Sequence, residues 1–443
     1  MDQITPAMDY YLAEFTRVER NLPGADKIGE QRQDGLRAFT AHGFPTVREE
    51  DWKYTDLRPL SKHTFEISDQ AAKLDADTLA ACIPEALDAY RVVVVDGHFV
   101  ADLSQLSGLP AGVHIGSFAD YLNDNAKASI QHPLLDKQPG SLVAMNAAFV
   151  TDGVHVELQR NAVLDKPLHV ITLASGSEDE RMAQVRHRFE LHENSQATII
   201  EHYIGVGELA YFTNAVTEAV THANAQLTRC RLQEESPRRG YHVSVLFAHQ
   251  ERDSRIYNHS FDLGGRLARI DTHTWLGGEN TEIGLYGVFI GNDRQHIDNH
   301  TRVDHAIPHG TSREIFKGVL DGRSRGVFNG KIVIHQDAQK TDSEQSSDTL
   351  LLSKKAEIDA KPELEIYADD VIAAHGSTVG QLDEDAVHYL RSRGIDETGA
   401  RAILTYSFAR ELVQMLNMEP LERYIESTLM TKLPGGELFA NVV

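Results

Sequence analysis

The chain has 443 residues, 41% hydrophobic and 25% charged, enough for a sizeable core and two or three structural units. Its formal net charge of -23 argues against binding to nucleic acid or to an anionic membrane, because both need basic patches. The two cysteines, Cys82 and Cys230, form no CxxC motif. They exclude a disulfide framework and a cysteine-based metal cluster held by this chain alone.

The N-terminus gives no sign of export. Met1–Ile4 does not begin a basic segment followed by an apolar one, so no secretory signal is expected. Apolar runs such as Val92–Val95 are too short to cross a bilayer. The sequence therefore predicts a cytoplasmic protein.

Residues 1–90 are predicted to form an N-terminal helical domain. Met8, Tyr11, Phe15 and Val18 follow at helical spacing and make one apolar stripe. A second helix is expected to end near Gly43, a typical residue after a helix C-terminus. The segment that carries Trp52 is expected to lie on the surface with its aromatic rings in the core, since isolated aromatic residues usually pack.

Residues 91–380 are predicted to form one continuous β domain, which includes the short apolar stretch 142–149. In its second half, runs of alternating residues end at Gly, Asn or Asp, the pattern of strands and turns. The runs recur every dozen to sixteen residues or so, which favours the stacked coils of a β-helix over a β-sandwich. These runs are Leu267–Leu276, Glu282–Ile290, Gln295–His305, Ser312–Leu320 and Arg325–His335.

Residues 381–443 are predicted to form a C-terminal helical domain. Asp383 and Asp396 can each cap a helix, and a third helix is expected from Pro420 to about Met430. The second helix has a wide apolar stripe over residues 400–416, typical first of a core helix and second of a partner-binding surface.

A group of histidines and carboxylates offers one candidate metal site. His296, Asp298, His300, Arg302 and Asp304 share one face of an extended strand. Imidazole and carboxylate suit iron or zinc, but a guanidinium on the same face repels a cation. A solvated outer face of the β-helix is therefore the favoured interpretation.

Two alternative functions stay open at this point. One is a stand-alone metal-binding β protein that uses His296, His300 and His305. The other is a carbohydrate-active β-helix enzyme with acid–base chemistry at Asp298, Asp304 or Asp321. The sequence contains no nucleophile elbow, Walker A motif or GxGxxG motif, so acyl transfer and nucleotide binding lack their usual signals.

Several segments, found together, resemble the SufB/SufD family of iron–sulfur cluster assembly proteins. The most specific are Lys361–Val371 (KPELEIYADDV) and His375–Gly380 (HGSTVG). The resemblance covers nearly the whole chain and is densest from about 300 to 416. The other matching segments are Trp52–Thr55, Phe328–Val333, Asp337–Asp342, Leu350–Ser353 and Tyr389–Ile395.

Within the family, the cysteines point to the SufD type. SufB-like chains carry an assembly cysteine near the end of the β domain, whereas the residue two before His375 is Ala373 here. The resemblance implies that His375 contacts iron or a nascent cluster at the junction with a SufB-like paralogue. Neutral imidazole is a suitable iron ligand.

The resemblance also implies an architecture and a set of partners. The fold would be mainly β, a right-handed parallel β-helix flanked by N-terminal and C-terminal helical parts. The chain would be a scaffold and not an enzyme, with no tightly bound cofactor when isolated and with iron or a cluster held transiently. It would pair with a SufB-like paralogue, or with itself when isolated, and would contact the ATPase SufC through Tyr389, Leu390, Arg393, Phe408 and Leu412.

Overall fold

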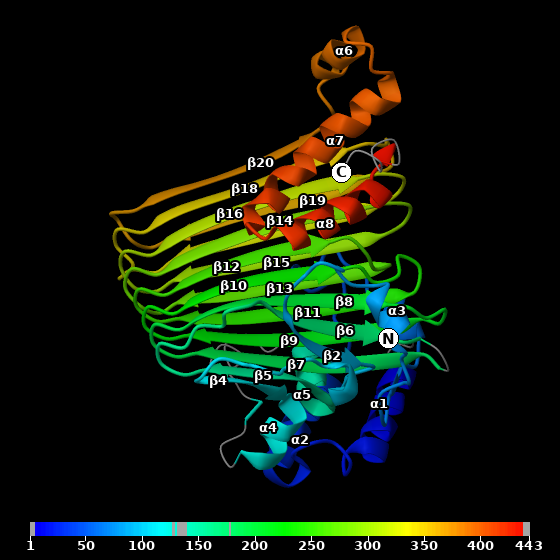
Figure 1. Cartoon of the computed structure of the whole chain (residues 1–443), viewed down its shortest axis with the longest axis vertical. Coiled ribbons are helices and arrows are strands. Elements are labelled where there is room, and N and C mark those ends of the chain that lie inside the picture. Colours follow the sequence, from blue (N-terminus) through cyan, green and yellow to red (C-terminus); the bar gives the residue numbers. More distant parts are fainter. Residues whose placement is uncertain (1–4, 126–128, 131–139, 177–178, 437–443) are drawn as a thin grey trace.

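The chain folds into a β-solenoid with helices at both ends (Figure 1). This computed structural model describes residues 5–125, 129–130, 140–176 and 179–436. The structure is mainly β and the solenoid has about eight turns. The prediction of a β-helix between two helical parts is therefore confirmed.

Two long sheets make the walls of the solenoid, and nearly all neighbouring strands in them are parallel. The first sheet has the order β19-β17-β15-β13-β11-β9-β7-β5-β4, with β1 beside β7. Its strands are β1 Glu66–Ile67, β4 Val113–Ser117, β5 Asp152–Leu158, β7 Arg181–Leu191, β9 Tyr211–Thr221, β11 Gly240–Gln250, β13 Leu267–Leu276, β15 His296–His305, β17 Arg325–Ile334 and β19 Glu357–Ile366.

The second sheet has the order β20-β18-β16-β14-β12-β10-β8-β6-β2-β3. Its strands are β2 Tyr90–Val95, β3 His98–Phe99, β6 Leu168–Ala174, β8 Gln196–Gly205, β10 Gln226–Gln233, β12 Arg255–Asp262, β14 Glu282–Gly291, β16 Thr311–Leu320, β18 Asp342–Leu351 and β20 Ile372–Gly380. The chain alternates between the two sheets along most of its length, so each turn of the solenoid contains two strands.

The register shows how long one turn is. Leu267 on β13 pairs with His296 on β15, which pairs with Arg325 on β17. The predicted repeat of a dozen to sixteen residues therefore measures half a turn, because successive strands along the chain lie in opposite sheets.

One corner of the solenoid, where the chain passes from the first sheet to the second, is built on residues in the left-handed conformation. Asn and Asp tolerate this conformation better than most residues. The side-chain amide Nδ2 of Asn194 donates to Asn161 Oδ1, and Nδ2 of Asn224 donates to Asn194 Oδ1, both at 2.9 Å. We call this corner of the solenoid the asparagine corner. Its residues with positive φ are Asn161, Asn194, Asn224, Asp253, Asn280, His309 and Lys340.

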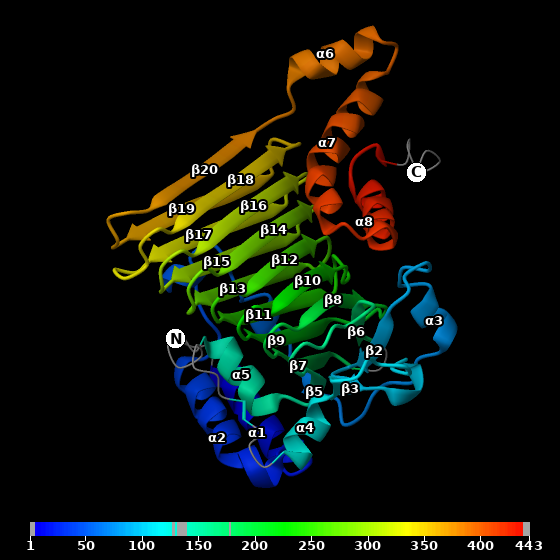
Figure 2. The same ribbon diagram turned by 60° about the vertical axis from the view of Figure 1, so that its left-hand side comes forward.

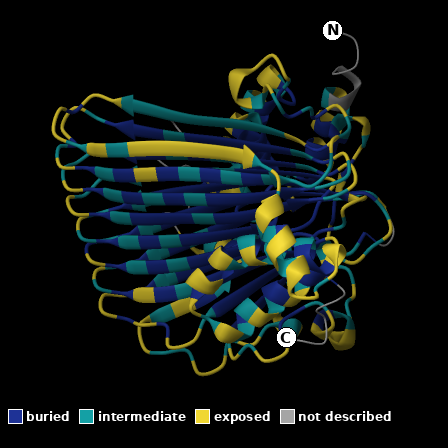
Figure 3. Cartoon of the chain, turned by 90° about the horizontal axis from the view of Figure 1, so that it is seen from above, coloured by how far each residue is buried: buried dark blue, intermediate teal, exposed yellow. Residues whose placement is uncertain are grey.

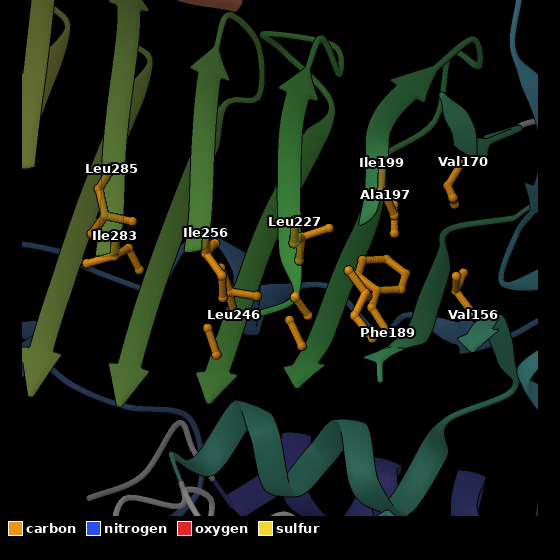
Figure 4. Packing of buried hydrophobic residues seen from close by; sticks show 14 of the residues in the cluster. Val156, Val170, Phe189, Ala197, Ile199, Leu227, Leu246, Ile256, Ile283 and Leu285 are labelled. Carbon is orange, nitrogen blue, oxygen red and sulfur yellow. The ribbon is translucent and has the colours of Figure 1, made fainter. Parts of the chain in front are cut away.

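The space between the sheets holds the main apolar core. Side chains from both sheets, such as Val156 and Phe189 of the first and Ile199 and Leu227 of the second, point toward one another there (Figure 4). This interior also holds polar side chains, among them Glu201 on β8 and Arg229 on β10, and Glu314 and Gln345 nearer the C-terminal end, each at most 3% exposed.

The N-terminal part is helical and includes a helix from the segment that was predicted to belong to the β domain. It contains α1 Thr5–Val18 and α2 Ala25–His42. A third helix, α5 Ser141–Phe149, comes from later in the chain and packs against α2. Gly35 permits this contact, because a Cβ there would lie 2.8 Å from Ala144 O. The prediction of continuous β structure over 91–380 is therefore wrong at α4 Phe118–Asp124 and at α5.

Within the described residues, three α-helices follow the last strand: α6 Glu384–Ser392, α7 Glu397–Val413 and α8 Glu419–Lys432. The second half of α7 and α8 pack against the outer face of the second sheet, on side chains such as Cys230, Phe261 and Val288. Helix α6 extends beyond β20 and away from the solenoid (Figures 1 and 2). Among the described residues, no helix has the length and apolar character needed to cross a membrane.

Candidate functional site

The C-terminal end of the solenoid is open. Strands β19 and β20 are the last in their sheets, and each is paired with one neighbour. In Figure 3, β20 is exposed over most of its length, whereas buried residues are frequent in the strands deeper in the solenoid. A free strand edge presents unpaired backbone groups, which another chain can pair with.

Large apolar side chains are exposed at the same end. Ile372 is 71% exposed, Tyr367 is 61% exposed and Val379 is 49% exposed. Exposed apolar residues that gather on one surface mark an interaction site more often than scattered ones do. The open end therefore combines two features of a docking surface, free strand edges and apolar side chains.

His375 lies on the inner face of β20. The register places it beside Gln345, which pairs with Glu314, which pairs with Leu285. Leu285, Glu314 and Gln345 are buried inside the solenoid, so His375 continues an inward-facing column of side chains at its open end. Because parallel neighbours lie about 4.8 Å apart, the backbone of His375 is one strand spacing from that of Gln345.

The column beneath His375 is polar. Gln345 Nε2 donates to Glu314 Oε2 at 2.7 Å, and Thr301 donates to the other carboxyl oxygen. Burial raises the pKa of Glu314 to about 7, although these two hydrogen bonds oppose the shift. Gly330 makes room for the column, because a Cβ there would lie 2.2 Å from Gln345 Nε2.

A second polar column ends beside His375. His305 Nε2 lies 2.9 Å from Ser312 Oγ, and Ser312 Oγ lies 2.7 Å from Ser343 Oγ. Ser343 pairs with Ala373 on β20. The residue two before His375 thus shares its inner face, but the methyl group of Ala373 offers no ligand atom.

The residues predicted to face SufC fall into two groups. Tyr389, Leu390 and Arg393 lie on or just after α6, and the Arg393 guanidinium lies 5.2 Å from the centre of the Tyr389 ring. Leu412 is 1% exposed and packs on the second sheet. Phe408 is half-buried, and the Lys317 ammonium lies 4.7 Å from the centre of its ring. The two α7 residues thus hold the helix on the solenoid, while the α6 residues are the more accessible.

The predicted solvated face of β15 is instead covered by the N-terminal part. Asp298 is 0% exposed, and its Oδ2 accepts a hydrogen bond from Thr55 and, at 2.7 Å, from Arg269 Nη1. Burial alone would raise the pKa of Asp298, but Arg269 holds it well below its usual range. This cover was not predictable from the sequence, because it comes from residues more than 200 positions away.

The residues of the two alternative functions do not converge. His305 points into the solenoid toward Ser312, whereas His300 lies on the outer face and contacts Asp298 at 3.0 Å. Asp304 accepts from Arg302 Nε at 2.6 Å. Asp321 accepts from the Gly322 amide at 2.7 Å and shapes a turn. These carboxylates are committed to structural contacts in the chain.

Trp52 has a structural position. The Arg269 guanidinium lies 4.2 Å from the centre of the Trp52 ring, and Arg269 Nη1 donates to the Asp51 carbonyl at 2.6 Å. The ring is half-buried against the N-terminal core cluster, as expected for a packed aromatic residue. Beside this segment lies a cavity of about 490 Å³, in which Lys361 pairs with Glu50 at 2.8 Å.

A second cavity, of about 810 Å³, lies at the corner opposite the asparagine corner and is lined by several cations. Within the part of the chain that the structure describes, four of its arginines have no acidic partner within salt-bridge distance. They recur at the start of four successive first-sheet strands, so they form a row of positive charge on a strongly acidic chain. The four are Arg238, Arg266, Arg294 and Arg323.

Comparison with known proteins identifies the family. Residues 172–408 match the model of the SUF system FeS cluster assembly SufBD core domain, and residues 7–170 match that of the SufBD protein N-terminal region. The iron–sulfur cluster assembly protein SufD of Escherichia coli is 34% identical over 93% of this chain and 94% of its own length.

Other similar proteins are also named as iron–sulfur cluster assembly proteins. An iron–sulfur cluster assembly SufBD family protein of Synechocystis is 32% identical over 88% of both chains. The iron–sulfur cluster assembly protein SufD of Bacillus subtilis is 29% identical over 66% of this chain and 67% of its own. The chain therefore belongs to the SufBD family of iron–sulfur cluster assembly proteins.

Proposed function

We propose that this chain is the SufD-like subunit of an assembly with a SufB-like paralogue and a SufC-type ATPase, where it supports iron acquisition and de novo cluster formation. The observation that carries this proposal is the position of His375, on the inner face of the last strand at the open end of the solenoid. There an imidazole can meet ligands from a partner chain that docks on the same end.

The partner chain would complete the site. Ala373 supplies no ligand atom, and Gln345 is already hydrogen-bonded to Glu314. His375 would therefore hold iron or a nascent cluster only together with groups of the SufB-like chain. The isolated subunit is then expected to bind iron weakly, to pair with a second copy through the same end, and to catalyse no reaction of its own.

The C-terminal arm suits a different partner. Tyr389, Leu390 and Arg393 lie on or beside a helix that extends past the solenoid, close to the docking end. Tyr and Arg are common anchors of protein interfaces. We assign the SufC contact to this arm, with Phe408 and Leu412 fixing α7 beneath it, and we place the assembly in the cytoplasm, where thiols stay reduced.

Replacing His375 with alanine is expected to slow cluster assembly by about tenfold or more while the complex stays intact, because a metal-contacting imidazole is lost. The measurement is cluster formation, followed by visible absorbance and by iron and sulfide content, in the complex co-purified with SufB-like and SufC-type partners. His309→Ala is the matched control, since His309 is exposed at the asparagine corner. Wild-type assembly rates in His375→Ala would contradict the role of His375, and failure of the partners to co-purify would contradict the assembly itself.

Replacing Val379 with lysine is expected to abolish pairing with the SufB-like chain, because an ammonium group would be placed in an apolar interface. Size-exclusion chromatography with light scattering measures the pairing. Val163→Lys is the control, since Val163 has nearly the same exposure, 47% against 49%, and lies in the loop before β6. Equal loss of pairing in both variants, or in neither, would show that the open end is not the docking surface.

A further inference from the structure

Five side chains that can bind a metal gather at the asparagine corner, far along the solenoid from His375. They lie in or directly after four successive strands of the first sheet, β5, β7, β9 and β11. Each side chain is half-buried, so solvent can reach the group although neighbouring turns enclose it. The five are Glu157, Glu190, His192, His222 and Glu251.

Three of these residues have the geometry of a metal site. The ligand atoms of Glu190, His192 and His222 all lie within 4.8 Å of one another. His222 Nε2 lies 3.2 Å from Glu190 Oε1. Two ligands bound to one tetrahedral ion at about 2.1 Å are about 3.4 Å apart, so this pair is already at the spacing that a metal needs.

Two more carboxylates lie within reach. Glu157 Oε1 is 3.0 Å from His192 Nε2, and Glu251 Oε1 is 3.1 Å from His222 Nδ1. A carboxylate on the second nitrogen of a ligating histidine fixes its tautomer and orientation, a frequent arrangement in metal sites. Glu251 has this position relative to His222 when Nε2 faces the ion.

The solenoid register holds the group in place. Leu191 pairs with Thr221, and Thr221 pairs with Gln250, so the next residue of each strand, His192, His222 and Glu251, stacks in one column. The two imidazole rings are parallel within 9°, with their centres 4.9 Å apart. The asparagine ladder through Asn194 and Asn224 begins two residues further on and stiffens the same corner.

The charge of the group favours a cation. Three carboxylates face one guanidinium, that of Arg188, which lies 3.3 Å from Glu190 Oε2. When the imidazoles are neutral, the cluster therefore carries net negative charge.

We propose that Glu190, His192 and His222 form a binding site for a divalent transition metal, with Glu157 and Glu251 as supporting carboxylates. Two imidazoles and a carboxylate suit Fe²⁺, Co²⁺ or Zn²⁺, whereas Mg²⁺ and Ca²⁺ prefer oxygen ligands throughout. The site uses residues of this chain alone. It depends neither on a partner subunit nor on the proposed role of His375.

Titration of the chelator-treated full chain with Co²⁺ tests the site, because Co²⁺ reports its coordination by visible absorption. We expect one equivalent to bind with bands of nitrogen and oxygen coordination, and Zn²⁺ to displace it. The variant with His192→Gln and His222→Gln is expected to lose at least about tenfold in affinity. Glu190→Gln is the second test, since it keeps both rings and the size of the side chain.

The controls separate this site from other histidines. His309→Gln removes an exposed imidazole that lies 3.7 Å from Glu279 at the same corner, and it is expected to bind Co²⁺ like the wild type. His375→Ala is also expected to bind normally, so a failure of the proposed function and a failure of this site are distinguishable. Unchanged Co²⁺ affinity in both His192→Gln/His222→Gln and Glu190→Gln, or no Co²⁺ uptake by the wild type, would overturn the proposal and leave a structural hydrogen-bond network.

Discussion

Replacing Arg229 with methionine is expected to destabilise the chain by about 3–5 kcal/mol at neutral pH, since it leaves a buried carboxylate without its counter-charge. Arg229 lies inside the solenoid, and its Nε donates to Glu201 Oε1 at 2.6 Å. Burial alone would raise the pKa of Glu201, but Arg229 holds it well below its usual range. Methionine keeps much of the volume and removes the charge. The shift of the urea unfolding midpoint measures the loss.

A second substitution distinguishes loss of charge pairing from poor packing. In the variant Arg229→Met with Glu201→Gln, the buried charge is gone while Tyr203 and Thr217 can still donate to residue 201. Most of the lost stability is therefore expected to return. Arg313→Met, which breaks a partly exposed pair with Asp342, is expected to cost less than about 1 kcal/mol. A double variant as unstable as Arg229→Met would show that packing dominates.

The same strand shows where prediction from sequence fails. In β10 the apolar Cys230 and Leu232 face outward, where they pack under the C-terminal helices, while Arg229 and Arg231 face inward. Alternation reveals that a strand has two faces, but both faces of this strand are buried. The pattern therefore could not identify the charged face as the inner one, and the buried pairs with Glu201 and Asp262 were missed.

Strand positions were predictable because each turn leaves a local signal, a Gly, Asn or Asp after a run of β-forming residues. The length of a full turn was not, because the sequence does not say that successive strands join opposite sheets. Helix α5 was missed for a related reason. Its run of Leu, Val, Ala and Met is short and apolar throughout, and such a run fits a buried strand as well as a buried helix.

The two candidate sites differ in how far the sequence could reach them. His375 was selected by its resemblance to the family, while its place above Gln345 and Glu314 follows only from the register. Glu190, His192 and His222 have no motif, since the second histidine lies one turn of the solenoid after the first. Without the length of a full turn, the sequence gives no reason to expect these three side chains to lie close together.

Replacing Glu314, which lies beneath His375, with glutamine is expected to remove a pH-dependent loss of the chain's stability. Burial raises the pKa of this carboxyl from 4.5 to about 7, so the folded chain binds a proton more tightly than the unfolded chain. Stability contributed by this group is fully present below pH 4.5 and is lost as the pH rises to about 7. The loss is complete above that pH and amounts to roughly 3 kcal/mol.

The test compares the wild type and Glu314→Gln at pH 5 and pH 8 by urea unfolding. Other titrating groups are common to both proteins, so the difference between their pH dependences isolates Glu314. Between pH 5 and pH 8, the free energy of unfolding of the wild type is expected to fall by roughly 2–3 kcal/mol more than that of the variant. Glutamine keeps the shape of the side chain and can still accept from Thr301 or Gln345. Parallel pH profiles would show that Glu314 is already ionised in the fold, and the column under His375 would then carry a negative charge at neutral pH.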